Sequence, residues 1–541
     1  MIKMTKNKLF IRSFFLAISI LILVGCQKKI NKISTSASWN PSIAVPVGEA
    51  NFLISDLLVN IDSGIIVGPL GGMSIEYEEN LDSVLASDFI SLEDYTEVFD
   101  LTPPGLVSVP VFLNGTTLSN SENVSTSYDA PSGVEINTLN FKSGTLTLNV
   151  VSTFQHDATL NVTITDLVDV NSLPITRSLN LLYEGNPSTS QTVSVDLSGY
   201  SADFTGGGTL TNSLRASIDA TITGTGTPGN PIVGDETINL SLGLSDLEYE
   251  NLTGYFGQDP LTSSSDSLLL KIFQSTNNQG SLSFSNPSLT FDINNSFGVP
   301  ININFDNFET IDSITGQSSP LVLSEPSLAI NTPLLMGETR NTQLTLNNQN
   351  TTNIESILDV NPKYFKYDIS AIPNPNGNTG QLNFIESGSK MVVKANLNLP
   401  FEGKAYGIKA KDTIDYSLDG TDVSSVESLL FRFNVDNGFP ISFSAQAIFT
   451  DDNFNPIFTL SDSPISLVGG ANVDSEGKVT SSVNNITNVK LSQDQVNLLG
   501  NVEHIIIDGV INTTDYQNST VKFYDSYGIS LKLGFILEVK N

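Results

Sequence analysis

The chain has 541 residues, of which 39% are hydrophobic, and its 25 Lys and Arg against 57 Asp and Glu give a net charge of −32. A surface this acidic repels phosphate backbones, which argues against nucleic-acid binding. The hydrophobic content is too high for a disordered chain, and the length is enough for several domains. Ser, Thr, Asn and β-branched residues are abundant and strong helix formers are sparse, which predicts an all-β protein.

The first 25 residues have the three parts of an export signal. A basic start from Lys3 to Arg12 contains no acidic residue, and an apolar run follows from Phe14 to Val24. A helix needs roughly 20 residues to cross a bilayer, so this run of about 11 is too short to be a transmembrane anchor. We predict a signal peptide over residues 1–25.

The signal ends in Leu23-Val24-Gly25-Cys26, which resembles the bacterial lipobox. The resemblance implies attachment of diacylglycerol to Cys26, cleavage before it and acylation of the new amino terminus. Several acyl chains would hold the protein stably on a membrane, with Cys26 as the lipid attachment site. Cys26 is the only cysteine, so we expect neither disulfides nor thiolate catalysis in the mature protein.

The residues after the cysteine bear on which membrane holds the anchor. Gln27 is not the aspartate that retains enterobacterial lipoproteins in the inner membrane, which favours the outer membrane. The opening Trp39-Asn-Pro-Ser-Ile-Ala-Val-Pro-Val47 resembles uncharacterised Bacteroidota lipoproteins, many of which reach the cell surface. Their surface-export signal is acidic, whereas residues 27–32 here are basic. We therefore expect an outer-membrane protein that faces the periplasm rather than the surface.

Strict alternation of apolar and polar residues recurs along the chain, as in Ser288-Leu-Thr-Phe-Asp-Ile-Asn294. This period predicts antiparallel strands with one wet face. We expect tandem antiparallel β-sandwich domains of immunoglobulin-like or LEA-like type with few short helices. The expected divisions are a signal at 1–25, a lipidated tether at 26–38, an N-terminal β domain at 39–135, and β-sandwiches at 136–260, 280–400 and 401–541.

A strand, a short polar turn with an aromatic residue and a second strand recur near Phe154, Phe297 and Phe439. These residues lie about 142 positions apart, a spacing that indicates duplicated domains. Chance recurrence in a biased composition is the alternative. The copy at Asp292–Asp306 also resembles the LEA-type-2 β-sandwich repeat, and that resemblance implies a role in lipid handling or stress protection.

Helices are expected at few places. Ser492-Gln-Asp-Gln495 forms a capping box before an apolar turn that Gly500 ends. Two further short helices are expected to begin at Ser55 and near Leu92.

Catalytic apparatus is sparse in the sequence. The only histidines are His156 and His504, and we expect neither to be catalytic. No nucleophile elbow, phosphate loop or dinucleotide fingerprint stands in its required context. We expect no enzyme activity and no cofactor, although the many carboxylates leave a hydrolase open. No metal site is expected, with one weak Ca²⁺ candidate formed by Asp451, Asp452, Asn453 and Asn455.

Four short stretches match the Asp-Ser/Thr-apolar pattern of Bacteroidota O-glycosylation. The acceptors would be Ser83, Ser267, Ser313 and Thr413. Such glycans would mark exposed loops.

These patterns predict a non-enzymatic binding or structural component of the outer envelope, held by its lipid and acting through contacts with an envelope protein. Two alternatives stay open. One is a glycan-binding lipoprotein of a nutrient-uptake system, which the 14 tyrosines allow and the single tryptophan disfavours. The other is a lipid-handling β-sandwich protein, which needs an apolar groove.

Overall fold

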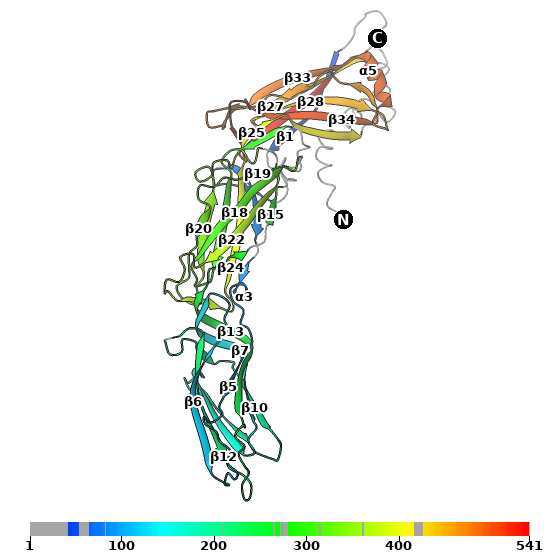
Figure 1. The fold of residues 1–541 in the computed structure, drawn as a ribbon. Coiled ribbons are helices and arrows are strands. Elements are labelled where there is room, and N and C mark those ends of the chain that lie inside the picture. Colours follow the sequence, from blue (N-terminus) through cyan, green and yellow to red (C-terminus); the bar gives the residue numbers. More distant parts are fainter. Residues whose placement is uncertain are drawn as a thin grey trace, which may run out of the picture.

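The structure, a computed structural model, describes residues 42–53, 64–81, 83–208, 210–262, 266–270, 273, 280–312, 315–359, 362–415 and 426–539. Its strands pair antiparallel and form three β-sandwiches, which confirms the all-β expectation. The sandwiches follow one another in an elongated body (Figure 1). We call them the basal, middle and distal sandwiches.

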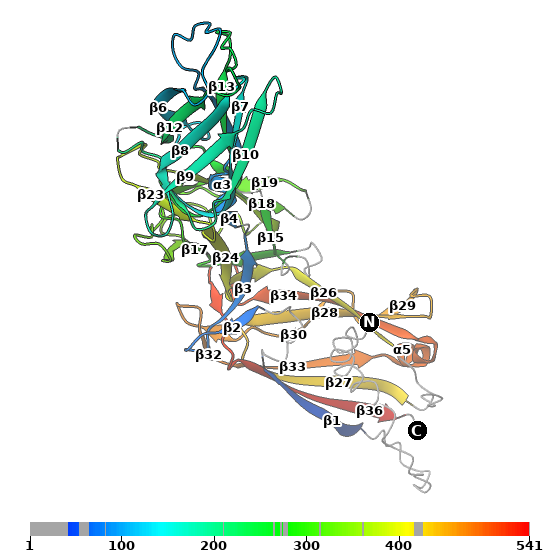
Figure 2. The same ribbon diagram turned by 90° about the horizontal axis from the view of Figure 1, so that it is seen from below.

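The basal sandwich holds both the first and the last described strands. Its main strands are β1 (Ser42–Leu53), β26 (Ile408–Asp415), β27 (Val426–Asn437), β28 (Ile441–Thr450), β29 (Pro456–Thr459), β30 (Ile465–Val468), β33 (Val483–Leu491), β34 (His504–Thr513) and β36 (Gly528–Val539). One sheet has the order β1–β36–β27–β33, and the other is β26–β34–β28 with β29 and β30 on the edge of β28. Figure 2 shows β1 beside β36.

The middle sandwich is built from two parts of the chain. Its strands are β2 (Ile65–Val67), β3 (Met73–Asn80), β4 (Val84–Leu85), β14 (Leu261–Thr262), β15 (Asp266–Leu269), β17 (Ser288–Asn295), β18 (Ile301–Asp312), β19 (Ser318–Pro320), β20 (Ser327–Ala329), β21 (Arg340–Leu346), β22 (Pro362–Pro373) and β24 (Lys390–Pro400). One sheet has the order β2–β3–β24–β17–β21, and the other has β14 and β15 on β22, then β18, then β19 and β20.

The distal sandwich is continuous in sequence. Its strands are β5 (Tyr95–Asp100), β6 (Thr117–Ser127), β7 (Val134–Ser152), β8 (Asp157–Val168), β9 (Pro174–Leu181), β10 (Thr189–Asp196), β11 (Ser201–Asp203), β12 (Ser213–Thr223) and β13 (Ile238–Phe256). One layer is β5–β13–β7–β10 and the other is β6–β12–β8–β9, with β11 bridging β7 and β8.

Alternating side chains explain the strands. In β17, Leu289, Phe291 and Ile293 are buried, while the alternate residues Ser288, Thr290, Asp292 and Asn294 are half-exposed on the other face. A side-chain period of two fits only an extended chain with one buried face. Phe291 packs on Phe305 and Phe308 of β18 with ring centroids 5.7 and 5.5 Å apart, which fills the space between the two sheets.

All three sandwiches share one plan of eight strand positions. The first strand pairs with the eighth in each: β1 with β36, β3 with β24, and β5 with β13. The second pairs with the seventh: β26 with β34, β15 with β22, and β6 with β12. The middle sandwich is inserted between the first and second strands of the basal one, and the distal sandwich between those of the middle one.

The same corner joins the third and fourth strands of each sandwich. A small polar residue ends the third strand and its side chain accepts a hydrogen bond from the backbone N–H of a phenylalanine two positions on. The pairs are Ser152 with Phe154 at 3.2 Å, Asn295 with Phe297 at 2.9 Å and Asn437 with Phe439 at 2.9 Å. Each phenylalanine is at most 2% exposed, so the recurrence noted in the sequence corresponds to one structural position.

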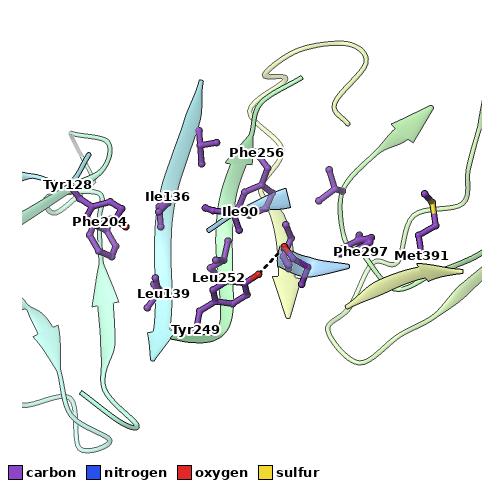
Figure 3. Packing of buried hydrophobic residues seen from close by; sticks show 14 of the residues in the cluster. Ile90, Tyr128, Ile136, Leu139, Phe204, Tyr249, Leu252, Phe256, Phe297 and Met391 are labelled. Atoms are coloured by element: carbon purple, nitrogen blue, oxygen red, sulfur yellow. Dashed lines mark hydrogen bonds between the residues drawn. The ribbon is translucent and has the colours of Figure 1, made fainter. Parts of the chain in front are cut away.

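The corners of the middle and basal sandwiches lie at the ends where the next sandwich joins, and the corner of the distal sandwich lies at its free end. Phe297 of the middle sandwich packs against Phe89 at 4.3 Å between ring centroids. Figure 3 shows Phe297, Met391, Ile90 and Phe256 as members of one cluster, with the hydroxyl of Tyr249 donating to the Ala86 carbonyl at 3.3 Å. Buried side chains of the middle and distal sandwiches form one continuous hydrophobic cluster.

Short strands from the loop between the seventh and eighth strands reinforce both junctions. In the middle sandwich this loop carries β23 (Asn383–Glu386), which pairs with β13 of the distal sandwich. In the basal sandwich it carries β35 (Val521–Lys522), which joins β25 (Glu402–Tyr406) and β16 (Ser281–Phe284) in a small sheet. Phe439 lies beneath this junction, in a cluster with Met73 and Tyr527.

The segment 39–135, treated above as one N-terminal β domain, contributes strands to all three sandwiches. Its described strands are β1 in the basal sandwich, β2 to β4 in the middle one, and β5 and β6 in the distal one. Strand periodicity specifies which side chains face a core but not which distant strand lies alongside, so the boundaries within this segment do not follow from local pattern.

The capping-box helix is confirmed. Ser492 caps α5 (Gln493–Leu498), and the single turn η1 (Leu499–Asn501) follows. The helix expected near Leu92 lies earlier, as α3 (Ala86–Phe89), because Asp88 returns its carboxylate to the Leu85 N–H and so fixes the start of the turn there. The expected start at Ser55 lies outside the described residues.

We expect Phe297→Ala to lower the free energy of unfolding by about 3–5 kcal/mol, because it empties a fully buried corner at the junction of two sandwiches. Chemical denaturation would measure this loss. Phe454→Ala, which removes a ring that is 54% exposed, is the matched control and should cost less than about 1 kcal/mol. Equal losses for the two variants would contradict the role given to the corner.

Candidate functional site

Within the described ranges, no further sandwich sits on the end of the distal sandwich that lies farthest from the basal one. Four segments lie at this end: the loop between the first and second strands (101–116), the corner 153–156, the loop between the fifth and sixth strands (182–188), and the loop between the seventh and eighth strands (224–237). We call this surface the distal tip. In the middle and basal sandwiches, the connection equivalent to 101–116 contains the next sandwich, and the loop equivalent to 224–237 carries the short strand at the junction.

Backbone pairing joins two loops of the distal tip, 101–116 and 224–237. Val109 and Ile232 exchange hydrogen bonds of 2.7 and 2.8 Å, and the Phe112 N–H donates to the Asn230 carbonyl at 2.8 Å. These bonds satisfy polar groups that the apolar surroundings would otherwise leave unpaired. The loops therefore form one ordered surface.

Two glycines make this close approach of the loops feasible. A Cβ at Gly224 would lie 2.2 Å from the Leu113 carbonyl oxygen, and one at Gly229 would lie 2.6 Å from that of Phe112. Gly229 also has a φ of +129°, a conformation that side chains disfavour.

His156 lies beneath the two loops and is 2% exposed. Its Nδ1 accepts a hydrogen bond from the Thr225 N–H at 3.1 Å, and the Phe112 ring meets its edge at 5.1 Å between centroids. Because Nδ1 accepts from an N–H, the ring is held in a neutral tautomer. Nε2 makes no hydrogen bond of normal geometry with the described residues.

Burial lowers the pKa of His156 below its ordinary value of 6.5. The Pro231 carbonyl and the carboxylates of Glu236 and Asp157 favour the charged ring, but they do not outweigh the loss of solvation. Glu236 is itself buried, where its carboxylate accepts from the Val233 N–H at 2.5 Å and the Gly234 N–H at 2.8 Å. Both side chains thus shape the 224–237 loop.

The two joined loops present an apolar and almost uncharged surface, and Glu184 of the 182–188 loop is exposed at the same end. Residues 101–116 and 224–234 contain no charged side chain, in a chain whose net charge is −32. Four aliphatic side chains in these loops are 43–67% exposed: Val107, Val111, Leu113 and Val233. Asp235 follows at the rim and is exposed. Exposed apolar side chains gathered at one end of a folded body are typical of contact surfaces.

Sequence reasoning did not single out the distal tip. The signal available was the uncharged, Pro- and Gly-containing run Leu101–Thr116 in so acidic a chain. Its position at one end of the molecule depends on the nested order of the strands.

The weak Ca²⁺ candidate lies in the tight turn between β28 and β29. One carboxylate oxygen of Asp451 accepts from the N–H groups of Asn453 at 2.9 Å and Asn455 at 2.8 Å, and the other accepts from Asn455 Nδ2 at 3.0 Å. These bonds lower the pKa of Asp451, the largest contribution coming from the Asn455 side chain. Asp452 adds no bond to this set. Within the described ranges, no group of three or more His, Cys, Asp or Glu side chains is arranged to hold a metal ion.

His504 begins β34 at the outer end of the basal sandwich. Its Nδ1 lies 3.1 Å from an Asp415 carboxylate oxygen, and Phe454 stacks on the ring at 4.5 Å. The structure does not bring it near His156. The hydroxyl oxygen of Thr225 lies 3.5 Å from His156 Nδ1. This hydroxyl donates its hydrogen bond to the Gln155 carbonyl at 3.2 Å.

The remaining sequence-predicted sites are dispersed. Ser83 is exposed, whereas Ser267 and Thr413 are half-buried within β15 and β26. Ser313, Cys26 and Trp39 lie outside the described residues. No helix in the described part of the chain is long and apolar enough to cross a membrane.

No family model and no curated protein matches the chain. Among solved structures, the chain is similar to a protein of Parabacteroides distasonis that is named as secreted, at 14% identity and a TM-score of 0.31, over 54% of this chain and 90% of that one. It is also similar to the PBSX exported protein XepA, at 11% identity and a TM-score of 0.13, over 56% and 86% of the two chains. A third similarity is to the VP2 subviral particle of infectious bursal disease virus, at 10% identity and a TM-score of 0.15, over 90% and 86%.

We expect the distal tip to lose stability on mild acidification because of His156. The folded pKa lies below the unfolded value of 6.5, so the unfolded state binds more protons as the pH falls through that value. The contribution of His156 is therefore complete above pH 6.5 and declines below it, by no more than about 1.4 kcal/mol per pH unit.

His156→Asn is the variant that isolates this effect, because the amide oxygen can accept the Thr225 N–H without titrating. Unfolding free energies of both proteins at neutral pH and at pH about 5, near the lower limit of histidine titration, would be compared. The wild type should lose more stability than the variant. Parallel losses would show that His156 does not contribute.

Proposed function

We propose that the chain is a lipoprotein of the bacterial outer envelope that acts without catalysis, as a structural and binding component. In this proposal Cys26 carries the lipid, and the distal sandwich makes protein contacts away from the membrane. The lipobox and the preceding signal support the anchor. The observation that carries the proposal is the nested order of the sandwiches, which separates the beginning of the chain from the distal tip.

The distance between the anchor and the body follows from the sequence. Strand β1 begins at Ser42, so residues 27–41 lie between it and Cys26. Fifteen residues span about 50 Å at most when fully extended. The basal sandwich would therefore lie nearest the membrane, and the middle and distal sandwiches would extend from it.

The leaflet follows from the residues next to the cysteine. The stretch 27–32 is basic and lacks the acidic surface-export pattern. Its lysines, Lys28, Lys29 and Lys32, suit contact with anionic lipid headgroups. We propose that the body faces the periplasm.

The interior of the middle sandwich bears on the lipid-handling alternative. A lipid tunnel would need open space between the two sheets, but Phe291, Phe305 and Phe308 pack there with centroids 5.4–5.7 Å apart. The glycan alternative would need exposed tyrosine rings on which a sugar can stack, and the pair Tyr406 and Tyr516 is the described feature that most resembles such a platform. They stack on each other at 4.2 Å, so each ring covers one face of the other. Neither observation favours these alternatives over protein contacts.

We expect Cys26→Ala to move the protein out of the membrane fraction. Without the thiol no diacylglycerol can be attached, and no other anchor is proposed. Fractionation of cells that express the wild type or the variant would measure this, with Ser83→Ala as a control that keeps the lipobox. A variant that stays in the outer-membrane fraction would contradict the lipid anchor.

We expect a photo-crosslinking residue at Val111 to join the protein to an envelope protein in intact cells. The same residue at Phe454, which is similarly exposed but lies in the basal sandwich, is the control and should give no such product. Blotting for the chain, followed by mass spectrometry, would identify the product. No product at Val111, or equal products at both positions, would contradict the proposal.

A further inference from the structure

The sandwich end that forms the distal tip is occupied at both lower levels of the molecule. The middle sandwich sits on this end of the basal one, and the distal sandwich sits on this end of the middle one. In each case the occupant is a sandwich of this same chain.

The contacts at the two lower levels use the same parts. The loop after the first strand leads into the occupant, and the loop before the eighth strand adds a short strand at the junction, β23 or β35. The corner phenylalanine lies beneath, as Phe297 or Phe439. At the distal tip the corresponding parts are the loops 101–116 and 224–237 and Phe154.

The charge of the molecule restricts what can approach this end. Two copies of a chain with a net charge of −32 repel each other. A basic partner would instead be attracted to the acidic faces. The uncharged loops 101–116 and 224–234 are suited to a partner of the same sign, because they present apolar side chains without charge.

We propose that the distal tip is a self-association site at which two copies of this chain meet tip to tip, through Val107, Val111, Leu113 and Val233. The inference rests on the proposed function and names the partner in its protein contact. A two-fold contact places the same patch on both copies, and an apolar patch is complementary to itself.

The size of the patch sets the strength of the contact. Stable interfaces use about 20–30 residues on each side, whereas the two joined loops contribute four exposed aliphatic residues. The dimer is therefore reversible and depends on concentration. Anchoring on a membrane raises the effective concentration of the copies.

Sedimentation velocity of residues 27–541, which contain every described strand and no cysteine, tests the proposal. The protein should change from monomer to dimer as its concentration rises through the micromolar range. Val111→Asp combined with Leu113→Asp should raise the dissociation constant at least about tenfold, because each contact would then bury unpaired charges. Leu334→Asp alters a residue that is 69% exposed in the middle sandwich, and it should leave the dimer intact.

Crosslinking gives a second measurement that does not depend on the aspartate variants. In the protein of residues 27–541, which has no cysteine, Val111→Cys places a single thiol at the distal tip, and a short bis-maleimide should join two copies. Leu334→Cys, the control, should give no crosslinked dimer. Circular dichroism would confirm that all variants fold.

The remaining outcomes each overturn the inference. The first is a protein that stays monomeric at all concentrations. The second is a dimer that Leu334→Asp disrupts, or one that the Val111→Asp and Leu113→Asp pair leaves intact. The third is a fluorophore on the thiol of the Val111→Cys variant that becomes buried in neutral phosphatidylcholine vesicles while the protein does not dimerise. In cells, a Val111 crosslink to a different envelope protein would refute self-association yet leave the proposed function standing. A product of twice the chain mass supports both.

Discussion

The pairing of the first strand with the eighth is the constraint on which the rest of the structure depends. In the basal sandwich it joins Ser42–Leu53 to Gly528–Val539, so almost the whole chain lies between the two strands. In the middle sandwich it closes over the complete distal unit. Pairing two strands that are far apart in the sequence closes a long loop, and the lost chain entropy is offset only when further contacts form. These pairings are therefore late events in folding. The distal sandwich, whose strands are contiguous, needs no partner segment from outside and is the unit able to form first.

Two chain crossings alone would leave an inserted sandwich free to move relative to the one that carries it. The corners explain why the junctions between sandwiches are packed instead. A polar residue at the end of the third strand fixes the backbone two residues later, which directs a phenylalanine into the end of the sandwich. The end becomes an apolar platform, and the inserted unit covers it. Phe297 and Phe89 show the result, with side chains of two sandwiches in one cluster. The connection therefore depends on core packing as well as on the two chain crossings.

Local pattern was enough for much of this fold and for little of the candidate site. The alternation around Phe291 predicts a strand with one buried face, and the capping box at Ser492 predicts a helix, since both signals lie within a few residues. The recurrence of Phe154, Phe297 and Phe439 indicated a repeat. The partner of β1 could not be inferred, because periodicity specifies a face and carries no information about a strand nearly 500 residues away. The distal tip was missed for the same reason: Val107 and Val233 become neighbours in one surface only after the strands are paired.

The distal tip is where the repeat stops, and its chemistry differs from that of a simple cap. A terminal unit of a repeat protein gains solubility from a polar outer face. Here the terminal loops instead expose Val111 and Leu113, and residues 101–116 and 224–234 contain no charged side chain although the chain is strongly acidic. Buried His156 and Glu236 hold the 224–237 loop in place beneath them. An apolar surface that is held rigid in this way loses little conformational entropy when it is covered, which is the property expected of a contact surface rather than of an exposed end.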